Sequence, residues 1–304
     1  LLNDNFTGTG KTATHHVGGI DINSSSHIQI SSTTASDFSK NGISFTAQYA
    51  PGDIVTNSIT LNNVSSTNNG SSIGWAGLAF YTTNSAGGQG NSIRDVYFQG
   101  TNTFSGNTGQ GIFIEGDSDA NLGAHVKPRY VISGKNKERV DLGTAVFSGN
   151  TTDILNYQTK GVFALKATFG GITGDNMTLA QIKDEKTRIF DHIKSDRLGY
   201  VRFFIKGHNK SPKNGYTAAN AGILKWHKVR IAVSYDYESS YSKTVDAYNK
   251  LTSPIYNANV STNQIDATGT PPGTYYWQER PVFSDGTHGV WSNPWKLVVT
   301  PSEQ

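Results

Sequence analysis

The chain lacks cysteine and is poor in charge. No cysteine occurs among its 304 residues, which excludes disulfides and thiolate-bound metals. Charged residues make up 16% and the net charge is +3, without the dense Lys/Arg patch of a nucleic-acid-binding protein. No apolar run approaches the roughly 20 residues that span a bilayer. We therefore expect neither a nucleic-acid partner nor a membrane span.

What the chain has in quantity is glycine and short polar runs. There are 33 glycines, and Ser/Thr/Asn/Gly stretches separate segments of alternating hydrophobicity. Residues 43–47, for example, place Ile43, Phe45 and Ala47 on one face of an expected strand. This texture is typical of many short strands joined by polar loops. It predicts an all-β protein of one large domain with a small β appendage.

Two neighbouring stretches, residues 199–208 and 223–236, alternate as half-buried strands do. Opposite the expected apolar faces lie cations mixed with rings. If the strands are adjacent, these side chains form a basic, ring-lined surface suited to an anionic polysaccharide. The alternative is that long cations cap the solvent side of an antiparallel sheet. The candidate ligand-binding residues are Tyr200, Arg202, Lys206, His208, Trp226, Lys228 and Arg230.

Acidic residues recur at every second position in residues 111–119. Glu115, Asp117 and Asp119 would align on one side of a continuous strand. Three interpretations stay open: a solvated turn, a calcium site, or the acid and nucleophile of a retaining glycosidase. Gly116 and Ser118 favour the turn. Calcium is the one cofactor that the sequence brings forward, with these three carboxylates as its ligands.

The order of segments over residues 1–240 resembles the concanavalin-A-like, laminin-G-like jelly roll of bacterial secreted proteins. The resemblance implies an antiparallel β-sandwich, a glycan- or protein-binding role, and in some members a glycosidase or lyase site. It also implies a secreted or cell-surface location. The segments that carry it are residues 3–6, 77–81, 163–169, 175–179 and 226–231.

Residues 241–304 differ from the preceding part of the chain in their aromatic runs and turn residues. The run Tyr275-Tyr276-Trp277, a turn at Asp285-Gly286 and the run of residues 291–295 predict a β-hairpin. They resemble the closing strands of a bacterial fibronectin-type-III-like domain. The predicted domains are therefore a jelly roll at 1–240 and a small β segment at 241–304. Such a mixture indicates a piece of a larger multidomain chain.

Three functions follow from these features. The first is a non-catalytic module that binds an extracellular, anionic polysaccharide. The second is an enzyme on the same fold: a polysaccharide lyase that uses the groups of residues 200–208, or a glycosidase that uses Glu115 and Asp117. The third is a structural or adhesive module of a larger surface or phage-tail protein.

Overall fold

A computed structural model of the chain divides it into two compact units. Unit 1 comprises residues 1–173 and 185–203, and unit 2 comprises residues 174–184 and 204–304. The chain is all-β, as predicted, and the described part contains no helix long and apolar enough to cross a membrane. The structure describes residues 4–8, 18–47, 55–81, 92–114, 140–156, 162–174, 177–178, 180–181, 193–195, 201–202, 204–284 and 286–301.

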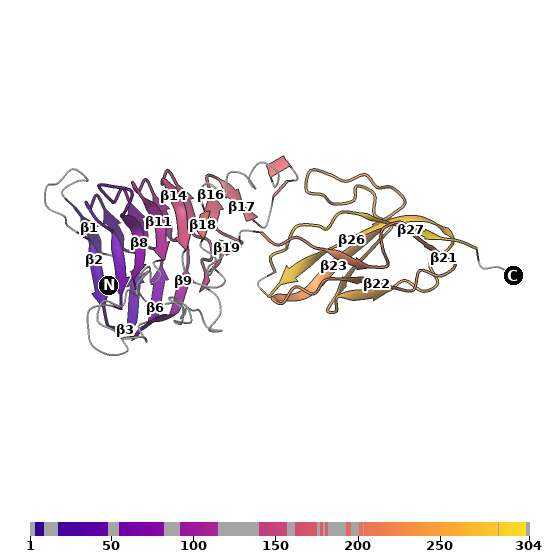
Figure 1. The fold of residues 1–304 in the computed structure, drawn as a ribbon, viewed down its shortest axis with the longest axis horizontal. Coiled ribbons are helices and arrows are strands. Elements are labelled where there is room, and N and C mark those ends of the chain that lie inside the picture. Colours follow the sequence, from indigo (N-terminus) through magenta and orange to yellow (C-terminus); the bar gives the residue numbers. More distant parts are fainter. Residues whose placement is uncertain are drawn as a thin grey trace, which may run out of the picture. The chain divides into compact units, whose positions relative to one another are not determined.

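Unit 1 is a stack of coils, and each coil contributes one strand to each of three faces (Figure 1). Sheet 1 consists of β1 (Asn5–Thr7), β4 (Thr34–Ser36), β7 (Ser65–Thr67), β10 (Thr103–Ser105), β13 (Val146–Ser148), β16 (Thr168–Phe169) and β17 (Ile172–Thr173). Sheet 2 consists of β2 (Ile20–Asn23), β5 (Ile43–Thr46), β8 (Ala76–Tyr81), β11 (Gln110–Ile114), β14 (Thr152–Asn156) and β18 (Ile193–Ser195). The third face contains β3 (Ser26–Ser31), β6 (Val55–Asn62) and β9 (Ser92–Gln99), and separately β12 (Val140–Asp141), β15 (Val162–Phe163) and β19 (Val201–Arg202).

The strands of successive coils pair in parallel. In sheet 1 the register Thr34↔Ser65↔Thr103↔Val146 continues without a shift, and of its described pairs only β16 with β17 is antiparallel. Unit 1 is therefore a parallel β-solenoid, in contrast to the antiparallel jelly roll that the resemblance implied. The physical reason is that alternation fixes which side chains are buried but is the same for parallel and antiparallel neighbours.

A ladder of buried asparagines follows the strands of sheet 1. The Asn69 backbone N–H and side-chain amide both donate to Oδ1 of Asn107, at 3.0 and 3.2 Å. Asn107 repeats this arrangement on Asn150, at 3.0 and 2.9 Å. At the end of the ladder, the Phe38 N–H donates to Oδ1 of Asn69. Each asparagine thus accepts a hydrogen bond from a backbone N–H in the turn of the preceding coil. Without this bond the N–H would be buried without a partner.

The residue before each ladder position turns the chain with a positive φ. It is Asp37, Asn68, Gly106 and Gly149 in successive coils, with φ between 56° and 65°. Glycine and Asn/Asp tolerate this left-handed conformation best, which explains the residue types at this corner. Inside the coils, Phe104 stacks on the ring of Phe147 at 5.5 Å. The ladder and the ring stack together fix the register of unit 1.

Unit 2 is a β-sandwich. Its smaller sheet contains β20 (Asn209–Ser211), β22 (Ile223–Trp226) and β25 (Gln264–Asp266). Its larger sheet contains β21 (Tyr216–Ala218), β27 (Trp295–Val299), β26 (Gly273–Phe283), β23 (Ala232–Ser240) and β24 (Tyr256–Val260). Side chains from both sheets form one core, in which Trp226 of the smaller sheet contacts Tyr237 of the larger one. The compact units divide near residue 204, not at the predicted boundary of 240, because β20, β22 and β23 are needed to complete this sandwich.

Replacing Asn107 by alanine should destabilise unit 1 strongly. The side chain is 1% exposed and makes hydrogen bonds to two neighbouring coils. Its loss leaves several buried groups unpaired, so we expect a cost of about 2–5 kcal/mol in chemical denaturation. Gln99→Ala, which shortens an exposed amide on β9, is the matched control and should change stability by less than about 0.5 kcal/mol. Equal effects of the two substitutions would contradict a structural role for the ladder.

Candidate functional site

The two stretches predicted to form one binding face are not two continuous strands. Residues 201–202 are strand β19 of unit 1, whereas Lys206 pairs with Val290 in unit 2. The first stretch is thus split between the two units. Tyr200 and the side chain of Arg202 lie outside the described residues.

Trp226 is buried, so it cannot serve as an exposed platform for a sugar. Its side chain is 0% exposed and lies edge-on to Tyr235, at 5.6 Å. The prediction failed because residues 223–236 are not one strand. Strand β22 ends at Trp226 and β23 begins at Ala232, and the turn between them contains Lys228 and Arg230. Leu224 and Trp226 lie two residues apart on β22 and therefore on the same face of the strand. The apolar Leu224 indicates that this face, and with it the Trp226 ring, points into the core.

What the structure does bring together, among the described residues, is a small cluster of basic side chains: Lys206, His208 and His227. The His227 N–H donates to the His208 carbonyl at 2.9 Å. Burial, followed by the charges of Lys206 and His227, lowers the pKa of His208. Burial also lowers the pKa of Lys206, whose Nζ donates to Asn293 Oδ1 at 2.8 Å. His227 was missed because it was read as part of a longer strand.

The acidic triplet Glu115, Asp117 and Asp119 lies outside the described residues, so the calcium site remains a prediction. Within the described part of the chain, no group of three or more His, Asp or Glu side chains is arranged to hold a metal ion.

Three polar residues align on the third face of unit 1. His27, Ser58 and Asp95 occupy one register position on β3, β6 and β9, each with φ between 53° and 56°. A Ser-His-Asp relay needs the histidine between the other two groups. Here the serine is in the middle, and two strand spacings, about 9–10 Å, separate the histidine backbone from that of the aspartate. The row is a left-handed backbone position repeated in three neighbouring strands, and it is not a catalytic relay.

A pocket lined by tyrosines opens at one side of the sandwich of unit 2. It encloses about 390 Å³ between β22, β23, β24 and the loop that follows β25. Tyr237 and Tyr275 contribute from the core, each 5% exposed. Tyr241 and Tyr256 border it with 63% and 53% of their surface exposed. Exposed rings beside buried ones give the pocket an apolar floor and aromatic edges.

Sequence and pairing explain why these rings meet. Tyr237 and Ser239 lie two residues apart on β23, so both face the pocket, and Ser239 pairs with Tyr256 on β24. The Tyr237 and Tyr256 rings are 6.1 Å apart, edge to face. Tyr241 follows β23 and lies 5.3 Å from the ring of Tyr275. The aromatic walls therefore come from a strand pair and from the residue that leaves it.

Polar groups border the same pocket. The Asp266 carboxylate accepts the Thr268 N–H at 2.8 Å, and hydrogen bonds from Thr268 lower the pKa of this aspartate, which keeps it ionised. The Tyr275 hydroxyl donates to the Pro271 carbonyl at 2.8 Å, and burial raises the pKa of this tyrosine. The pocket thus offers a carboxylate and hydroxyls beside its rings. Among its described lining residues there is no Lys, Arg or His.

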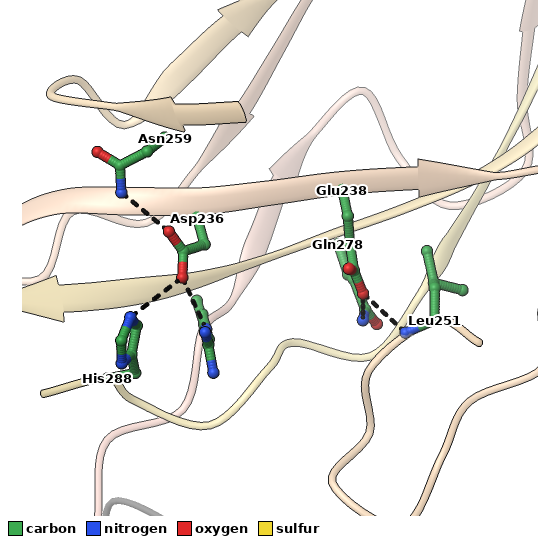
Figure 2. Close-up of polar contacts among 7 residues, drawn as sticks. Asp236, Glu238, Leu251, Asn259, Gln278 and His288 are labelled. Carbon is green, nitrogen blue, oxygen red and sulfur yellow. Dashed lines mark hydrogen bonds and ion pairs between the residues drawn. The ribbon is translucent and has the colours of Figure 1, made fainter. Parts of the chain in front are cut away.

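The outer face of the larger sheet contains two carboxylates with different surroundings (Figure 2). Asp236 pairs with Arg280 at 2.9 Å and His288 at 3.4 Å, and it accepts a hydrogen bond from Asn259. Glu238 accepts hydrogen bonds from Gln278 and from the Leu251 N–H, at 2.6 and 2.7 Å. Burial raises the pKa of Glu238 in spite of these bonds. Both side chains bind protein groups and have a structural role.

Glu279 is the most unusual ionisable group of unit 2. It points to the core side of β26, is 0% exposed, and neither carboxyl oxygen has a hydrogen bond of good geometry. Burial raises its pKa to about 8, which the backbone N–H of His208 opposes in part. Its neighbour Gly207 has no room for a side chain, since a Cβ there would lie 2.4 Å from Glu279 Oε1.

Glu279→Gln should make the stability of unit 2 less sensitive to pH. Because the folded pKa lies above the unfolded one, near 4.5, the wild-type protein loses stability as pH rises from about 4.5 to 8. The substitution removes this ionisation. We expect similar stability at pH 4 and a gain on the order of 3 kcal/mol at pH 8, measured by denaturant unfolding at both values. Asp246→Asn, at an exposed carboxyl, is the control. A gain of equal size at pH 4 would contradict the explanation.

Comparisons with protein-family models, with curated proteins and with solved structures gave no match for this chain. The site is therefore interpreted from its own geometry.

Proposed function

We propose that unit 2 is a non-catalytic carbohydrate-binding module, and that the tyrosine-lined pocket holds a sugar residue. The observation that carries the proposal is the pair of exposed rings, Tyr241 and Tyr256, beside polar groups at one pocket. Aromatic faces stack on sugar C–H groups, hydroxyls donate and accept hydrogen bonds with sugar hydroxyls, and carboxylates accept them. A volume near 390 Å³ falls within the range of small-ligand pockets.

The charge of the pocket favours a neutral glycan over the anionic one that the sequence predicted. Asp266 remains ionised at neutral pH and would repel a uronate or sulfate group. The anionic preference rested on two faces in which a ring lies beside cations. The Trp226 ring of one face is in the core, and the Tyr200 ring of the other lies outside the described residues. Among the described residues, no exposed ring is found beside Lys206, His208 and His227, which leaves the tyrosine pocket as the better-supported site.

The wider setting is part of the same proposal. A sandwich whose central strand carries Tyr275-Tyr276-Trp277 supports the likeness to fibronectin-type-III-like domains. A stack of coils followed by such a sandwich suits a secreted or cell-surface protein, as a piece of a larger multidomain chain. A calcium site at residues 115–119 is compatible with this setting.

The second candidate function is structural or adhesive. It is favoured by the solenoid of unit 1, since parallel coils with a satisfied polar interior form a rigid spacer. In that case the chain would present a neighbouring domain without binding sugars. The enzymatic alternative has less support, because the tyrosine-lined pocket has no Lys, Arg or His among its described lining residues to act as a base or to neutralise a uronate carboxylate.

Tyr241→Ala and Tyr256→Ala should each weaken retention of the protein in affinity gels that contain neutral polysaccharides. Hydroxyethyl cellulose, xylan and galactomannan are suitable probes, with alginate as the acidic comparison. Loss of one stacked ring should reduce affinity about 3- to 10-fold. Because both side chains are more than half exposed, the fold should be unaffected.

Tyr216→Ala provides the matched control, since Tyr216 is 42% exposed on β21 and away from the pocket. Retention that is equal in all gels, or that falls equally with Tyr216→Ala, would refute the pocket as the sugar site. Retention in alginate alone would instead favour the cluster of Lys206, His208 and His227 as the sugar site.

A further inference from the structure

The outward face of sheet 1 carries two rows of small hydroxyl side chains. Most strands of this sheet are three residues long, and the middle residue of each points into the coil. The residues on either side of it point outward. The first row is Asn5, Thr34, Ser65, Thr103, Val146 and Thr168, and the second row is Thr7, Ser36, Thr67, Ser105 and Ser148. All but Asn5 and Val146 are serine or threonine.

Register makes these rows regular. Each coil pairs with the next through directly opposite residues, with no bulge recorded between β1 and β16. Neighbouring strands lie about 4.8 Å apart, and residues two apart on one strand lie about 6.6 Å apart. The face is therefore an approximately rectangular grid of hydroxyls with these two spacings. The ladder of Asn69, Asn107 and Asn150 inside the coils holds successive coils, and so the rows of the grid, in register.

The hydroxyls of the grid have no hydrogen-bond partner among the described residues. In the described part of the chain none of them makes a side-chain hydrogen bond, whereas the inward Ser66 hydroxyl donates to the Gly77 carbonyl at 2.7 Å. Most of the grid side chains are half-exposed. Neither row contains a charged or an aromatic residue. Their donors and acceptors are thus not used by the described part of the chain, and their neutrality and regular spacing suit an uncharged, regular partner.

We propose that this hydroxyl grid binds the surface of ice. Crystalline water is an uncharged lattice of oxygen atoms whose repeats on its prism face are of similar size to the two spacings of the grid. Threonine and serine hydroxyls can occupy water positions in such a lattice, because each donates one hydrogen bond and accepts others. Threonine methyl groups between them add apolar surface, which orders the adjacent water.

Other partners fit the grid less well. A nucleic acid or an acidic glycan would require cations, which the two rows lack. A sugar chain would require rings for stacking, and these are found in the pocket of unit 2 instead. The proposed ice-binding face is thus separate from the proposed sugar pocket, and either one stands without the other.

The test uses the full chain in a growing ice hemisphere, together with thermal hysteresis in the same buffer. We expect the protein to be enriched in the ice and to show measurable hysteresis. Thr67→Tyr places a bulky ring at the centre of the second row, between Ser36 and Ser105, and should reduce enrichment by more than half. Ser148→Tyr, at an exposed position of the same row, is a second variant that should fold even if Thr67→Tyr does not.

Thr60→Tyr is the matched control, because Thr60 is half-exposed on β6 of another face. It should leave enrichment unchanged. Exclusion of the wild-type protein from ice, to the same degree as a serum albumin standard, would overturn the proposal. An equal loss with Thr60→Tyr would also overturn it, as would binding to microcrystalline cellulose that depends on Thr67 without any enrichment in ice.

Discussion

The structure of unit 1 depends on parallel pairing in register, held from inside by the hydrogen bonds between Asn69, Asn107 and Asn150. Each of these amides satisfies the backbone of the preceding coil, so a slip of one residue would leave buried polar groups unpaired on several coils at once. The cost of such a slip explains how coils of unequal length can stack regularly. Residues 115–139 separate β11 from β12, for instance, and yet β10 and β13 pair in register in sheet 1.

Two different surfaces result from two ways of arranging strands. In unit 1 the stacking of like positions repeats one small chemical group along a flat face, which suits a repetitive partner. In unit 2 two sheets pack against each other, and the side of the sandwich beside β24 and β25 leaves a pocket between rings. A pocket of that kind suits a single sugar. The two proposals therefore concern ligands of different size and regularity.

The all-β class could be predicted from the many short segments joined by polar loops, and alternation located some strands, such as the one at residues 43–46. The direction in which the strands pair could not be predicted, because alternation is the same in parallel and antiparallel sheets. The missed signal was a repeat: Phe-Ser-Gly-Asn occurs at 104–107 and again at 147–150. Insertions of unequal length between coils hide this repeat from a search for a fixed period. Trp226 was misplaced because a turn at residues 230–231 shifts the phase of the strand that follows.

The most direct test of the account is cross-linking across sheet 1, which is straightforward because the chain has no cysteine of its own. In the parallel register Thr67 is directly opposite Ser105, at a strand spacing that a disulfide can bridge. The double variant Thr67→Cys with Ser105→Cys should oxidise to an intramolecular disulfide, detected by mass spectrometry. The diagonal pair Thr67→Cys with Thr103→Cys should not. Cross-linking of both pairs to the same extent, or of neither, would contradict the in-register stack of parallel coils.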